Sequence, residues 1–65
     1  MEVDPMKYQV GDLIKVPEDK YSPEELVIIT KVLPETRYYE IYDFIKGEND
    51  SYIQEYLDEC GEKVG

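Results

Sequence analysis

Residues 26–45 have the sequence LVIITKVLPETRYYEIYDFI, and this stretch predicts two β-strands joined by a tight turn. Val and Ile dominate Leu26–Leu33, and these β-branched residues fit strands well. Pro34-Glu35-Thr36 is the expected turn, because Pro has no backbone donor to give to a sheet. Near its start Leu26–Leu33 is apolar on both faces. We therefore expect it either to lie in the centre of a sheet or to present one face to a partner.

The second of these strands, Arg37–Ile45, alternates between two faces. One face carries Tyr39, Ile41 and Ile45, and the other carries Tyr38, Tyr42 and Phe44. The residues that follow, 46–50, contain Gly and Asn, which tolerate the positive φ that many turns need. We expect a turn there.

Upstream of this pair, Tyr8–Val16 predicts another strand, which is entered through Gly11-Asp12. Val10, Ile14 and Val16 would share one face, because they recur at a period of two. Pro17 is expected to end the strand, since it removes a backbone donor.

The connection between the first two strands contains Ser22-Pro23-Glu24-Glu25, which has the pattern of a helix capping box. Only about one turn fits before the apolar strand begins, so this pattern predicts a short helical turn near 23–25.

Two interpretations fit residues 51–60. Ser51-Tyr52-Ile53-Gln54 can begin a fourth strand, followed by a 3₁₀ or short α segment near 54–60. The same residues form a capping box, and helical spacing then relates Ile53, Tyr56, Leu57 and Cys60, with Gly61 as a stop. We prefer the strand, because a three-stranded sheet would leave both edges open. The helix stays an alternative.

The composition limits the function classes. A chain of 65 residues forms one small domain, which we place at 8–65 after a flexible arm at 1–7. Its 17 Leu, Ile, Val and Phe residues and seven Tyr suffice for a small core. A net charge of −9 argues against direct binding to nucleic acid or membranes. The lack of histidine excludes His-dependent triads and the usual zinc sites, so we expect no enzyme, metal or cofactor.

The order of these elements resembles a small SH3-like β-barrel. The segments that carry the resemblance are Tyr8–Val16, Val27–Val32, and Tyr52-Ile53 followed by Tyr56-Leu57. They are also similar to the short proteins of tailed phages, most of which have no assigned activity. The resemblance implies a mainly β fold of four to five antiparallel strands and a viral protein. A single cysteine, Cys60, fits a cytoplasmic location, in the host cell if the protein is viral.

The candidate binding residues combine acids with tyrosines. Residues 47–65 carry six acids against one lysine, a net charge of −5. Carboxylates in such a segment can meet a basic surface, and tyrosine is common in binding surfaces. The residues proposed to contact a partner are Tyr38, Tyr42, Glu48, Asp50, Glu55, Asp58 and Glu59. The alternatives are acids that only keep the domain soluble and tyrosines that fill the core.

The function that we expect is a small acidic module that binds a host protein with a basic surface and inhibits or redirects it. Its carboxylates would imitate a nucleic-acid backbone if that surface normally holds nucleic acid. A structural or assembly protein that self-associates through a strand edge or the Leu26–Ile29 face is the alternative. A small enzyme or metal binder is the least favoured class.

Overall fold

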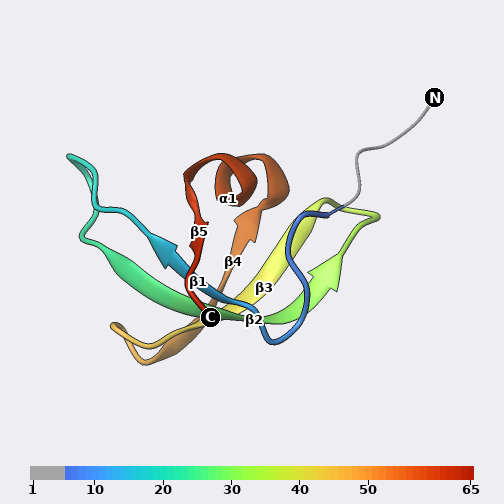
Figure 1. Ribbon diagram of the computed structural model, residues 1–65, viewed down its shortest axis with the longest axis horizontal. Helices are drawn as coiled ribbons and strands as arrows, with labels where there is room; N and C mark the ends of the chain where they lie inside the picture. Colours follow the sequence, from blue (N-terminus) through green and yellow to red (C-terminus); the bar gives the residue numbers. More distant parts are fainter. Residues whose placement is uncertain (1–5) are drawn as a thin grey trace.

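The computed structural model describes residues 6–65. Along the chain it contains β1 (Leu13–Val16), β2 (Glu25–Leu33), β3 (Tyr38–Asp43), β4 (Glu48–Ile53), α1 (Gln54–Cys60) and β5 (Glu62–Lys63). The strands form one five-stranded antiparallel sheet in the order β4-β3-β2-β1-β5, and the sheet curves around a single core (Figure 1). The predicted mainly β fold is confirmed at this level, as an open sheet with one short helix.

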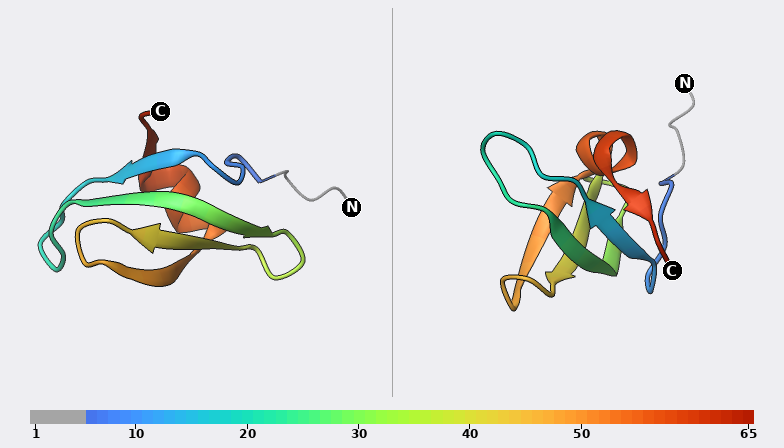
Figure 2. Two further views of the ribbon diagram at one scale, coloured as in Figure 1. Left: turned by 90° about the horizontal axis from the view of Figure 1, so that it is seen from below. Right: turned by 60° about the vertical axis from the view of Figure 1, so that its left-hand side comes forward.

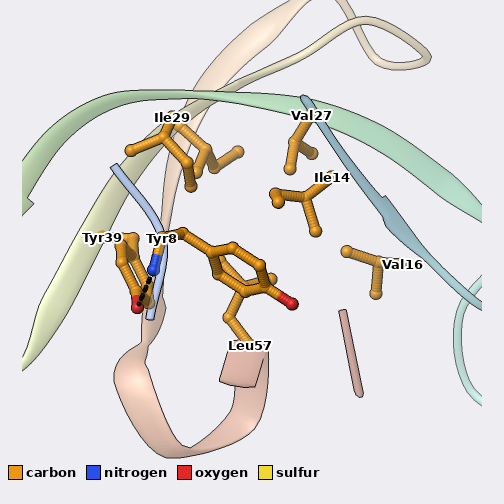
Figure 3. Packing of buried hydrophobic residues seen from close by; sticks show 8 residues of the cluster. Tyr8, Ile14, Val16, Val27, Ile29, Tyr39 and Leu57 are labelled. Atoms are coloured by element: carbon orange, nitrogen blue, oxygen red, sulfur yellow. Dashed lines mark hydrogen bonds between the residues drawn. The ribbon is translucent and has the colours of Figure 1, made fainter. Parts of the chain in front are cut away.

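The core lies between the sheet and α1. It consists of Tyr8, Ile14, Val16, Val27, Ile29, Tyr39, Ile41 and Leu57, none of which is more than 3% exposed. In Figure 3 the strands supply one wall of this cluster, and Leu57 closes it from the helix. Burying a large aliphatic or aromatic side chain contributes about 1.5–3 kcal/mol, so this cluster is the main source of stability.

A β-bulge changes the phase of β2 near its middle, after the stretch that is apolar on both faces. In the pairing of β2 with β3, Thr30 is an extra residue between Ile29 and Lys31. The bulge shifts the alternation by one residue. Val27 and Ile29 therefore face the core before the bulge, and Val32 packs against it afterwards. The turn that follows occupies residues 34–37 and includes the predicted 34–36. Arg37, predicted as the first residue of the next strand, ends the turn at a φ of 60°, so β3 begins at Tyr38.

The predicted first strand is too long. The structure places a turn at residues 9–12, where the Gln9 backbone amide donates to the Asp12 carboxylate over 2.9 Å and Gly11 has a φ of 95°. Val10 is 64% exposed in this turn and does not share a face with the buried Ile14. Gly has no Cβ and adopts this φ at little cost, so Gly11 separates Tyr8 from the strand.

The predicted helical turn near 23–25 is wrong. Residues 23 and 24 have no helical structure, and Glu25 is the first residue of β2. Asp19 organises the loop instead, because its carboxylate accepts from the Tyr21 and Ser22 amides at 2.7 and 2.8 Å. Ser22 donates its amide to that turn and does not cap a helix.

The turn after β3 covers residues 44–47, so it begins earlier than predicted. Asp43 fixes it: one carboxylate oxygen accepts from the amides of Ile45 and Lys46 at 2.8 and 3.1 Å, and Gly47 has a φ of 71°. Ile45 lies 63% exposed in the turn and not on the core face of β3. The buried position there belongs to Asp43.

Both interpretations of residues 51–60 are correct in part. A strand, β4, runs to Ile53, and an α-helix begins at Gln54. The helix buries Leu57, as the helical spacing indicates, but leaves Cys60 exposed. Gly61 ends the helix, and its amide donates to the Leu57 carbonyl over 2.8 Å.

Gly61 is needed for its lack of a side chain and not for an unusual φ, which is −76°. A Cβ there would lie 2.6 Å from the Leu57 carbonyl oxygen and 2.8 Å from Ile14 Cγ2. We expect Gly61→Ala to cost about 1–3 kcal/mol of unfolding free energy, as overpacking does. Urea unfolding measures this loss. Gly65→Ala is the control, since its Cβ would make ordinary contacts at 3.4 Å; equal stability of the two variants would contradict the packing.

Residues 1–5 of the expected arm lie outside the described residues, and the next residue, Met6, packs against the core. Within residues 6–65 no helix has the length and apolar character required to cross a membrane.

Candidate functional site

The side of the sheet opposite the core carries an apolar surface, which we call the outer face. Side chains alternate along a strand, so the neighbours of the buried residues project to this side. Its apolar members are Leu13, Leu26, Ile28, Leu33, Tyr38, Tyr42, Phe44 and Ile53. The strand register arranges most of them in two rows, with Leu13, Ile28 and Tyr42 in one and Leu33, Tyr38 and Ile53 in the other.

Several outer-face side chains are accessible. Tyr38 is 41% exposed, Ile53 45% and Phe44 50%. The Phe44 ring packs edge-on against Tyr42 with 5.3 Å between the ring centroids, so these rings form a rigid aromatic pair. The helix covers the other side of the sheet (Figure 2). The outer face is therefore apolar surface in contact with solvent.

An open groove lies on this face at the end where β2, β3 and β4 meet. Its lining residues are Leu33, Thr36, Tyr38, Glu40, Asn49, Asp50 and Ser51. Tyr38 supplies an aromatic ring and Glu40 supplies a carboxylate on the outer face, and the acidic residue Asp50 adjoins them at the sheet edge. The groove thus combines apolar contact with negative charge, which suits a cationic side chain with an apolar stem.

The seven predicted contact residues do not form one surface. Tyr38 and Tyr42 lie on the outer face. Glu48 and Asp50 are exposed on β4, and their pairing with Asp43 and Ile41 of β3 puts their side chains on the core side of the sheet edge. The structure brings Tyr38 and Asp50 to the same groove.

The three predicted acids on the helix are placed apart from the outer face. Glu55 and Glu59 are exposed on α1, whereas Asp58 is half-buried. Asp58 accepts a hydrogen bond from the Tyr39 hydroxyl over 2.7 Å, and that hydroxyl in turn accepts from the Tyr8 amide over 3.1 Å. The Asp58 carboxylate therefore joins the helix to the core, which is a structural role.

Burial raises the pKa of Tyr39 to about 12, with Asp58 adding to the effect. A raised pKa favours the protonated, folded form. This stabilisation is complete below about pH 10 and is lost between pH 10 and 12; two pKa units correspond to roughly 2–3 kcal/mol. We expect the free energy of unfolding to fall over this interval, as measured by urea unfolding at several pH values.

Two variants test the source of this alkaline instability. Tyr39→Phe lacks the ionising group and should lose less stability between pH 10 and 12 than the parent chain. Tyr21→Phe, at a ring that is 85% exposed, should behave like the parent. Identical pH profiles for Tyr39→Phe and the parent would contradict the assignment to Tyr39.

A buried polar cluster at the opposite end of the sheet is absent from the sequence predictions. Glu25, 4% exposed, accepts a hydrogen bond from the Tyr52 hydroxyl, and its other oxygen lies 3.0 Å from Lys46 Nζ. Burial and the Glu25 carboxylate raise the pKa of Tyr52, whose ring stacks on Tyr56 with 5.5 Å between the centroids. The Glu25 hydrogen bond and charge raise the pKa of Lys46.

This cluster links the first residue of β2 to β4 and to the turn after β3. The alternation along β2 does indicate that Glu25 is buried, because Glu25 has the same phase as Val27 and Ile29. The capping-box pattern of residues 22–25 instead assigns Glu25 to a helix end, and so it does not predict that Glu25 is buried. Its donors and acceptors satisfy one another, so the arrangement is suited to holding the fold.

Within residues 6–65 no three His, Cys, Asp or Glu side chains are grouped to hold a metal ion. Comparison of the chain with protein-family models, with curated proteins and with solved structures finds no significant match. The functional argument therefore depends on the geometry and charge of the surface described above.

Proposed function

We propose that this protein is a small binding module that docks on a basic surface of a partner protein. The observation that supports this most directly is the outer face, where an accessible apolar surface adjoins a groove lined by Tyr38, Glu40 and Asp50. Binding interfaces typically combine buried aromatic anchors with a polar rim. Tyr38, Tyr42 and Phe44 are suitable anchors.

Charge supports the choice of partner. Residues 47–62, which include β4, α1 and the first residue of β5, contain six acids and no Lys or Arg. Lys15 lies on β1 and Lys31 on β2, so the β4 side of the sheet is its acidic side. Complementary charge speeds the encounter of two proteins and disfavours acidic competitors.

Affinity capture from a lysate, read by mass spectrometry, tests the proposal when it includes variants. A partner bound through the outer face should be retained by the parent chain and released at high salt. A Tyr38→Ser, Phe44→Ser double variant should lower its affinity about tenfold or more, equivalent to 1.4 kcal/mol or more. Tyr21→Ser is the matched control, because Tyr21 is an exposed tyrosine in the loop at 17–24.

Charge variants locate the acidic contribution. Glu55→Lys with Glu59→Lys tests the helix without disturbing the hydrogen bond of Asp58 to Tyr39, whereas reversal at Asp58 would also weaken the fold. Partner binding that survives the loss of Tyr38 and Phe44 but fails in the helix double variant would contradict the outer-face proposal.

A second candidate function is assembly through self-association, because the outer face exposes apolar side chains that a second copy could cover. Sedimentation velocity separates the candidates. Oligomers that grow with concentration and disappear in the Tyr38→Ser, Phe44→Ser variant favour assembly, and a monomer at all concentrations opposes it.

The SH3-like barrel belongs to the same proposal. A long loop between β1 and β2, short turns before β3 and β4, and a helix that returns the chain to pair β5 with β1 support it. The viral origin, the host partner, its inhibition and the nucleic-acid mimicry stay predictions.

A further inference from the structure

β4 has an unpaired edge. It is the last strand of the sheet, with β3 on one side and no strand of residues 6–65 on the other. Figure 2, left, shows it at the end of the stacked strands. All of its residues except Tyr52 are exposed, and the strand is six residues long. An exposed edge of this length is a template for pairing with another chain.

The hydrogen-bond pattern identifies the free backbone groups. Antiparallel pairs alternate between bonded and non-bonded positions. The Gln54 amide donates to the Arg37 carbonyl over 2.7 Å, which makes this a bonded pair. Bonded positions recur at every second residue, so the register with β3 makes Tyr52 and Asp50 bonded positions as well. The amides of Asn49, Ser51 and Ile53 and the carbonyls of Asn49 and Ser51 therefore point to the open edge, whereas the Ile53 carbonyl belongs to the N-cap of α1.

A hydrogen bond at Ser51 agrees with this assignment. The Ser51 amide donates to the carboxylate of its neighbour Asp50 over 2.8 Å. The Asp50 side chain thus covers the central donor of the open edge. A strand that pairs here has to replace this contact, and a cationic side chain can then hold the displaced carboxylate.

The groove adjoins the same edge. The residues with outward backbone groups, Asn49 and Ser51, have side chains on the outer face and line the groove with Tyr38 and Glu40. Alternate side chains of an added strand would project to this face. A Lys or Arg among them would place its stem against the Tyr38 ring and its charge near Glu40.

The charges distinguish the occupants of the edge. If a second copy of β4 paired antiparallel to the first, the Glu48 and Asp50 carboxylates of both copies would lie close together, and such like charges destabilise a sheet. A basic strand would instead lie beside Glu48 and Asp50 on one face of β4, and its side chains on the other face would point toward Glu40 of β3. The charge pattern therefore favours a basic segment over self-pairing.

We propose that the open edge of β4 takes up an extended, Lys- or Arg-containing segment of the partner protein as an additional antiparallel strand, with one basic side chain in the Tyr38–Glu40 groove. This inference rests on the proposed function and specifies its partner. Backbone pairing would supply affinity, and the groove would supply specificity for a cation.

Amide NMR titration of the full chain tests this with synthetic peptides of roughly six residues, the length of β4. The first peptide alternates Lys and Val, the second alternates Glu and Val, and the third is the Lys peptide methylated at every backbone nitrogen. We expect the Lys peptide to shift the resonances of Asn49, Ser51 and Ile53. The other two should bind at least about tenfold more weakly, a difference of 1.4 kcal/mol.

Two variants assign the contacts. Glu40→Gln should weaken the Lys peptide several-fold, whereas Glu59→Gln, the same charge change on α1, should not. Ser51→Pro removes an outward amide and no bond to β3, so an edge strand should tolerate it, and it should abolish binding. If Ser51→Pro fails to fold, the methylated peptide tests the same backbone contact.

Equal binding of the methylated and unmethylated Lys peptides would overturn strand addition, and equal binding of the Glu peptide would overturn the choice of a basic occupant. These failures are distinguishable from failure of the proposed function. A partner whose capture still depends on Tyr38 and Phe44 leaves the binding module intact even if no peptide pairs with β4.

Discussion

Replacing Tyr39 by Ala is expected to remove about 3–5 kcal/mol of unfolding free energy, the usual cost of deleting a buried aromatic side chain. A chain of 65 residues holds roughly 3–10 kcal/mol in total. Tyr39→Ala should therefore lose roughly a third or more of the chain's stability and unfold at a much lower urea concentration than the parent. Urea unfolding followed by circular dichroism measures the loss.

The size of this effect follows from the contacts of Tyr39. Its side chain is 0% exposed, and its ring lies 5.8 Å from the Tyr8 ring between centroids (Figure 3). Its hydroxyl joins the Tyr8 amide to the Asp58 carboxylate. Removing the Tyr39 side chain would leave a cavity, and the Tyr8 amide and the Asp58 carboxylate would both lose the hydroxyl as a hydrogen-bond partner.

A matched pair separates the ring from the hydroxyl. Tyr39→Phe keeps the ring and should cost about 1–3 kcal/mol, because it removes one buried partner of two polar groups. Tyr38→Phe makes the same chemical change at the next residue, on the outer face, and should stay within about 0.5 kcal/mol of the parent. Equal losses at the two positions would contradict the assignment of faces along β3.

Leu57→Ala is the second large effect, at about 2–5 kcal/mol. Leu57 is the helix's fully buried contribution to the core, at 0% exposure, and it closes the cluster against the sheet. Its removal should loosen α1 together with β5, because the chain returns to β1 directly after the helix. Urea unfolding gives the energy, and amide exchange in α1 shows whether the helix loosens.

Leu13→Ala is the control for this loss. It makes the same substitution at a half-buried residue of the outer face. The smaller buried area predicts a smaller cost, near 1 kcal/mol or about half that of the core substitution. A larger loss at Leu13 than at Leu57 would show that the core lies on the other side of the sheet.

The sequence predicts the parts of the fold that depend on short-range patterns. The alternation of Val, Ile and Tyr locates β2 and β3, and Pro34 locates the turn between them. The features that these short-range patterns do not predict depend on tertiary contacts: Gly11 breaks an alternating pattern, and the bulge at Thr30 changes the phase of β2.

The candidate site was predictable only in part, for the same reason. Composition locates the acidic segment, but the register of β4 against β3 determines which acids are near Tyr38. Asp58 looks like a surface acid in the sequence, yet it is a partner of Tyr39. Glu25 looks like a capping residue, yet it is buried against Tyr52. The roles of Asp58 and Glu25 depend on contacts with residues that are distant in the sequence, and local patterns do not contain those contacts.

Backbone amide exchange in the free protein and in its complex with the captured partner tests the proposed binding mode most directly. In the free protein the amides of Asp50 and Tyr52, which bond to β3, should already exchange slowly. In the complex the amides of Asn49, Ser51 and Ile53 should become slow as well, because a partner strand now accepts from them. Protection that appears in α1 alone, with these three amides unchanged, would contradict binding at the β4 edge.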